Sequence, residues 1–74
     1  MNAEIIDRRG NLRLVLDPER VFPGLIVQGD TLVSLLEDLE EENPEGFATQ
    51  TVREWIGLYE EMMKDAGSDL PYVR

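Results

Sequence analysis

The sequence predicts an α+β fold: a three-stranded antiparallel sheet (β-β-β-α) covered by one helix and followed by a second amphipathic helix. The first observation is a series of short β-branched or aliphatic runs at 3–7, 12–16 and 25–28, separated by glycine- or proline-containing segments. The second is a stripe at the spacing of one helix face, formed by Leu32, Leu35, Leu36 and Leu39. The third is a wider apolar band at similar spacing between residues 51 and 65.

The first two strands are predicted to form a hairpin. Residues 3–7 contain two adjacent isoleucines between polar residues, and Gly10 lies in the connection that follows. In the return strand, residues 12–16, three leucines alternate with Arg13 and Val15. Because successive side chains of a strand point to opposite faces, we expect the leucines to form one buried face.

The segment FPGLIVQGDTL, residues 22–32, is predicted to contain a turn, a strand and a helix start. Proline fixes φ at the first central position of a type II turn, and glycine accepts the positive φ of the second. Gly29 is expected to end the strand, and Asp30 to cap a helix over about 31–42. The structural motif residues are Phe22, Pro23, Gly24, Gln28, Gly29 and Asp30.

The second helix is predicted over about 51–65, after a stop at Asn43-Pro44-Glu45-Gly46. Thr51 and Glu54 have the spacing of a capping box. The apolar band is wider than one contact surface requires, which leaves two interpretations open. In the first, Ile56, Tyr59 and Met63 close the core while Trp55 and Met62 lie at its edge. In the second, Trp55, Leu58 and Met62 remain on an outer face and form a dimer or partner contact. The residues assigned to self-association are Trp55, Leu58, Tyr59 and Met62.

Length and composition limit the classes of function. The chain of 74 residues is expected to form one domain over residues 1–66 with a tail over 67–74, and so small a core favours self-association, here a homodimer. Cysteine and histidine are absent, which removes the commonest metal ligands and the commonest general base. No apolar run approaches the roughly 18 residues of a membrane span, so we expect a cytoplasmic protein without membrane contact.

The net charge of −9 is unevenly distributed. Residues 1–29 hold four acidic and four basic residues, whereas residues 30–74 hold twelve acidic and three basic residues. A field of this sign repels nucleic acid and attracts basic surfaces, although a composition bias of the host would also acidify a chain. The residues assigned to a basic protein partner are Glu37, Asp38, Glu40, Glu41, Glu42 and Glu45.

The sequence contains no convincing catalytic, cofactor or metal site. Ser34 has no histidine to activate it, and Asp30 is better explained by helix capping than by metal binding or acid–base chemistry. The glycines near residue 29 lack the cation of a phosphate-binding loop. Four arginines of the first part are interpreted as an ordinary charged strand face and not as a nucleic-acid site: Arg8, Arg9, Arg13 and Arg20.

The segment 22–32 also carries a resemblance. Its Phe22-Pro23-Gly24 followed by Gln28-Gly29-Asp30-Thr31-Leu32 is similar to the "FPG…TQGDTLEEAL" segment of HicB-type antitoxins. It also resembles a family of short uncharacterised bacterial proteins with an FPG-x-x-x-QGD-[TS]-L core. The similarity covers about residues 3–42 and implies a β-β-β-α unit of a partial ribonuclease-H-like fold. HicB proteins use an acidic domain to block a small basic ribonuclease toxin.

The chain departs from that pattern after Gly46, where HicB domains continue into a fourth strand and this sequence predicts a helix. HicB proteins usually add a DNA-binding domain, for which this chain has no room, so operator binding is not implied. We therefore expect a non-enzymatic acidic module of the antitoxin or immunity type that binds a basic partner such as a small toxin. The alternatives are a homo-oligomeric structural or accessory domain and a DNA-mimicking inhibitor.

Overall fold

The computed structural model describes residues 2–73 and contains three strands followed by two helices. The order is β1 (Glu4–Arg9), β2 (Leu12–Leu16), β3 (Gly24–Ile26), α1 (Gly29–Glu42) and α2 (Phe47–Asp65). The sheet has the order β1-β2-β3, and both neighbouring pairs are antiparallel. The predicted α+β class and the predicted order of elements are confirmed.

The β1–β2 hairpin forms where the sequence predicts it. Gly10 adopts a φ of 57°, a left-handed conformation that glycine accepts without a steric penalty. Arg9 pairs with Leu12 next to this turn, and the register shifts between Ile5 and Asp7. Such a bulge bends an edge strand and increases its twist. The bounds of β2 are those predicted.

The predicted Pro23–Gly24 turn is wrong. Among residues 2–73 only Gly10 and Gly67 have a positive φ, and Gly24 is instead the first residue of β3, paired with Val15. The chain reverses earlier, where the carbonyl of Asp17 accepts the N–H of Arg20 at 2.9 Å. The carboxylate of Asp17 also accepts the N–H of Glu19 at 2.9 Å. An aspartate that bonds the backbone two residues on is itself a turn former, and this signal outweighed the proline–glycine pair.

Both helices begin before the predicted residues. α1 starts at Gly29, so Asp30 lies in its first turn and not at the N-cap, and its carboxylate accepts the N–H of Thr31 at 2.9 Å. A negative charge in the first turn still favours the helix through the macrodipole. α2 starts at Phe47 after Gly46, which places Thr51 inside the helix. The predicted capping box is therefore wrong.

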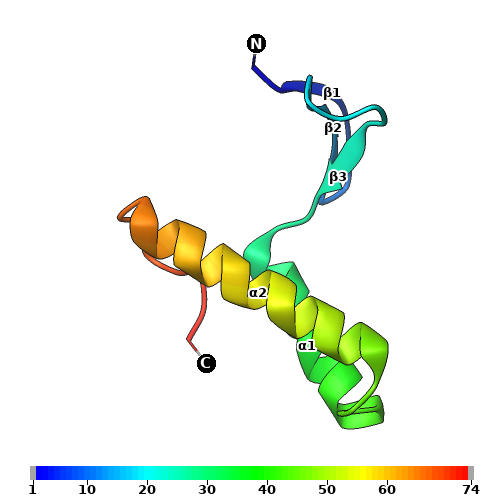
Figure 1. Ribbon diagram of the computed structural model, residues 1–74, viewed down its shortest axis with the longest axis vertical. Helices are drawn as coiled ribbons and strands as arrows, with labels where there is room; N and C mark the ends of the chain where they lie inside the picture. The colour runs from blue at the N-terminus through cyan, green and yellow to red at the C-terminus, as the bar shows by residue number, and fades with distance from the viewer. Residues whose placement is uncertain (1, 74) are drawn as a thin grey trace.

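The hydrophobic core lies between the two helices. It consists of Val33 and Leu36 from α1 packed with Val52 and Ile56 from α2, all of them buried. The predicted covering of the sheet by α1 is wrong, because within residues 2–73 no strand packs against either helix. Figure 1 shows the sheet at one end of the molecule and the helix pair at the other. The apolar stripe of α1 packs against α2 and is therefore not available to cover the sheet.

Thr49 joins the helices at the end where the chain reverses. It is only 1% exposed, and its hydroxyl lies 2.6 Å from the carbonyl oxygen of Asn43 and 3.3 Å from that of Leu39. These two carbonyls also accept the N–H groups of Gly46 and Asn43, at 3.1 Å and 2.8 Å respectively. The Thr49 hydroxyl of α2 therefore adds a hydrogen bond that ties α2 to the C-terminal end of α1.

The end of α2 and the tail fold back on the helix. Gly67 adopts a φ of 70°, its N–H donates to the carbonyl of Lys64 at 3.0 Å, and that of Ser68 donates to the carbonyl of Met63 at 2.9 Å. This is the hydrogen-bond pattern of a Schellman motif. Beyond it, the Tyr72 ring stacks on Tyr59 with centroids 6.4 Å apart.

A substitution tests the role of Thr49. Thr49→Val keeps the shape of the side chain but removes the hydroxyl donor, while the carbonyls of Asn43 and Leu39 keep their bonds from the N–H groups of Gly46 and Asn43. We therefore expect the free energy of unfolding to fall by about 0.5–1.5 kcal/mol, the net contribution of one hydrogen bond. Thr49→Ser keeps the hydroxyl, and its free energy of unfolding should fall clearly less. Chemical denaturation of the three proteins measures both differences, and an equal or greater stability of Thr49→Val would contradict the assignment.

A second substitution tests the contact between α1 and α2 at Gly29. A Cβ at this position would overlap the ring of Tyr59, so we expect Gly29→Ala to destabilise the protein by about 1–3 kcal/mol. Gly57 in α2 has open space around it. Gly57→Ala is therefore the matched control and should stabilise the protein by about 0.5–1 kcal/mol. Thermal unfolding gives both signs, and a stabilising Gly29→Ala would show that the helices are not this close.

Candidate functional site

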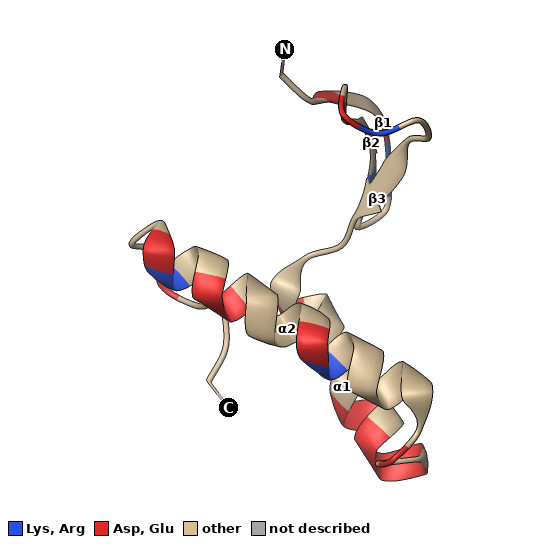
Figure 2. Ribbon diagram, viewed as in Figure 1, with Lys and Arg blue, Asp and Glu red and all other residues tan. Residues whose placement is uncertain are grey.

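The predicted partner-binding carboxylates gather at the C-terminal end of α1 and in the turn after it. Figure 2 shows the acidic residues concentrated along the last turns of this helix. All six are exposed. They are called the acidic patch below: Glu37, Asp38, Glu40, Glu41, Glu42 and Glu45.

Most of the acidic patch has no compensating charge. Within residues 2–73, the only one of its members in an ion pair is Glu40, whose carboxylate lies 2.9 Å from the guanidinium of Arg53 on α2. Both side chains of that pair are 44% exposed. An exposed pair of this kind contributes little, so the patch keeps nearly all of its negative charge.

The acidic patch works against the helix that carries it. The last turn of α1 holds no basic residue, although the negative end of the macrodipole favours cations there. Glu37 and Glu41 are also four residues apart, which places like charges side by side on one face. The stability of α1 therefore does not explain these carboxylates.

The residues predicted for self-association separate into two groups. Trp55, Leu58 and Met62 are 55%, 55% and 63% exposed and recur at helical spacing. These three are called the tryptophan stripe below. Tyr59 is half-buried and lies against Gly29 and the Tyr72 ring. Tyr59 therefore takes part in the internal packing of the chain.

A third surface was not recognised as a site from the sequence. Alternation along β2 and the pairing of Leu14 with Leu25 place four leucines on one face of the sheet. This leucine face consists of Leu12, Leu14, Leu16 and Leu25. It contains a hollow of about 260 Å³ that is also lined by Asp7 and Arg9. The alternation itself was visible in the sequence, but we expected α1 to cover it.

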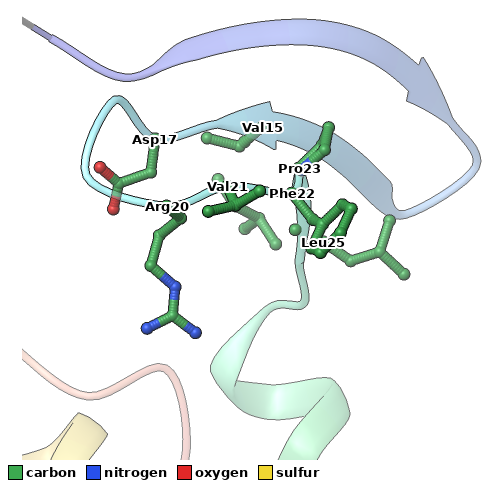
Figure 3. Close-up of a pocket in the computed structure, with 9 residues that line it drawn as sticks. Val15, Asp17, Arg20, Val21, Phe22, Pro23 and Leu25 are labelled. Atoms are coloured by element: carbon green, nitrogen blue, oxygen red, sulfur yellow. The ribbon is translucent and has the colours of Figure 1, made fainter.

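The FPG motif lines a separate, open hollow of about 620 Å³. Figure 3 shows that its side chains come from β2, from the segment before β3 and from β3 itself. Val21 and Phe22 are more exposed here than the apolar side chains of Leu25 and Ile26. The lining residues are Val15, Asp17, Arg20, Val21, Phe22, Pro23, Gly24, Leu25 and Ile26. Asp17 is occupied in the turn described above, so the hollow offers mainly apolar surface.

The remaining motif residues position the start of α1. Gln28 occupies the N-cap without a side-chain hydrogen bond, and Gly29 allows the close approach of Tyr59. In the part of the chain that the structure describes, no three acidic side chains come together as a metal ion would require. Over the same residues, no helix is both long and apolar enough to cross a bilayer.

Comparison with known proteins places the chain in a family. A search of curated proteins and a search of solved structures each give no match. A family model described as "Family of unknown function (DUF6959)" matches residues 1–48, which include the sheet, the FPG motif and all of α1. The match covers well over half of the chain. The protein therefore belongs to this family, DUF6959, whose function is unknown.

Proposed function

We propose that the protein is a non-enzymatic, acidic protein-interaction module of the HicB-type antitoxin or immunity class, which binds and neutralises a basic partner such as a small toxin. The observation that carries this proposal is the acidic patch, in which five of six exposed carboxylates have no ion pair among residues 2–73. The proposal places the protein in the cytoplasm.

The chemistry of the patch favours a basic protein. Clustered carboxylates increase the rate of encounter with a positive surface more than they increase the final affinity. They also repel one another and the end of α1. A partner that supplies lysine or arginine side chains relieves this repulsion on binding. The relief of the repulsion present in the free protein adds to the affinity for that partner.

A DNA-mimicking inhibitor would use the same surface. In that case the basic partner is a nucleic-acid enzyme whose phosphate-binding groove receives the carboxylates. Competition distinguishes the two, because double-stranded DNA would displace a DNA mimic from its target. A toxin bound through its own specific surface would be displaced much less.

The cost of the acidic patch can be measured without a partner. Glu41→Lys places a cation near the C-terminal end of α1 and replaces the like-charge pair with Glu37 by an opposite-charge pair. We expect the free energy of unfolding to rise by about 0.5–1 kcal/mol at low salt. High salt should reduce the gain by screening. Glu19→Lys, in the loop before β3, is the control and should change stability little, whereas a loss of stability in Glu41→Lys would contradict the argument.

The proposed function is tested by capture from the native host at low salt followed by elution with rising salt. We expect a basic protein to bind and to elute as the salt rises. The variant Glu37→Gln/Glu41→Gln/Glu42→Gln should lose binding. The control Glu4→Gln/Glu19→Gln/Asp69→Asn removes as many charges from elsewhere and should retain it. Failure to capture any basic protein, or equal capture by both variants, would overturn the proposal.

A further inference from the structure

The chain exposes more surface than a compact protein of its size. Its accessible surface is 6192 Å², whereas a folded monomer of 8.5 kDa is expected to expose about 4,700 Å². The radius of gyration is 13.9 Å, against about 11 Å for a compact chain of this length. The excess of about 1,500 Å² identifies surface that the chain does not cover by itself.

Apolar side chains of the sheet contribute to this exposed surface. Leu25 is 62% exposed, and Leu12 and Leu16 are about 40% exposed. A small sheet needs its apolar face packed to be stable in water, and contiguous apolar patches on monomers rarely exceed a few hundred Å². The leucine face is therefore apolar surface that the chain's own helix pair leaves uncovered.

We infer that this partner is a second copy of the chain, whose tryptophan stripe packs on the leucine face. Two such contacts, related by a two-fold axis, form one dimer in which each copy contributes a sheet to one contact and a helix to the other. Closed two-fold dimers are the commonest oligomers. A dimer that covered the whole excess of about 1,500 Å² on each copy would bury about 3,000 Å² in total, within the range of obligate homodimers.

The border of the leucine face holds an arginine and an aspartate that pair with each other, whereas the border of the tryptophan stripe is acidic. Arg9 lies beside the hollow of the leucine face and is 88% exposed, with Asp7 as its neighbour at 3.1 Å. The tryptophan stripe is bordered along α2 by carboxylates at helical spacing from Leu58, and none of them has an ion pair within residues 2–73. These carboxylates belong to Glu54, Glu61 and Asp65.

The dimer and the binding of a basic partner use different surfaces. The acidic patch ends α1 at the side of the helix pair that is far from the sheet (Figure 1). The two interactions also differ in their response to salt. An apolar contact persists when salt screens charges, whereas capture of a basic partner weakens. Failure of one proposal is therefore distinguishable from failure of the other.

Sedimentation of the full chain over a wide range of concentrations tests the inference, with the emission of Trp55 recorded on the same samples. We expect a dimer that survives high salt. The emission of Trp55, the only tryptophan, should shift to shorter wavelength as the dimer forms because the indole leaves water. A monomer at every concentration, or a dimer with an unchanged emission, would overturn the inference.

Matched variants identify the surfaces. Leu25→Asp and Leu58→Glu should each weaken the dimer about tenfold or more. The control Ile26→Asp lies next to Leu25 but on the opposite face of β3, and it should retain the dimer. Circular dichroism of each protein shows whether the fold is intact. Dimers that respond equally to test and control variants would contradict the assignment.

Mixing the two weakened variants provides the sharpest test. A heterodimer of Leu25→Asp and Leu58→Glu contains one contact in which both surfaces are intact, because the unchanged sheet of the second meets the unchanged stripe of the first. Each variant alone has two contacts that are both damaged. We expect the mixture to dimerise more strongly than either variant. No recovery on mixing would indicate sheet-to-sheet or helix-to-helix contacts and would overturn the pairing.

Discussion

The packing of α1 on α2 determines the rest of this structure. Leu36, only 2% exposed, and Ile56, fully buried, lie at the centre of the core. Because α1 has one apolar stripe, its use against α2 leaves the sheet without cover from its own chain. The exposed leucine face, the elongated shape and the excess accessible surface all follow from this one contact.

The charge of the molecule follows the same division. Residues 1–29 hold four of the six arginines, and the two helices hold ten of the sixteen acidic residues (Figure 2). The acidic patch is stabilised neither by the macrodipole of α1 nor by ion pairs, apart from that between Glu40 and Arg53. A surface that lowers the stability of the folded chain is best explained by a partner that binds it. The acidic patch therefore supports the proposed basic partner, and the uncovered leucine face supports the proposed second copy.

The sequence predicted the elements better than their packing. Alternation in β2 and leucine periodicity in α1 are local signals, and both elements formed. The cover of the sheet was mispredicted because periodicity shows which face of a helix is apolar but not which surface it meets. Thr49 was missed because an isolated threonine carries no periodic signal. Pro23 and Gly24 indicated a turn at their own position, but the chain reverses earlier, at Asp17. The acidic patch was predictable because its residues are neighbours in the sequence, so that their clustering does not depend on how the helices pack.

The exposed leucine face exists only if the apolar stripe of α1 packs on α2 and not on the sheet. Methyl nuclear Overhauser effects in the full chain measure this without any substitution. We expect strong effects between the methyl groups of Leu36 and Ile56 and none between those of Leu36 and Leu14. Effects between Leu36 and Leu14 would show that α1 covers the sheet, and both the exposed leucine face and the dimer built on it would then be contradicted.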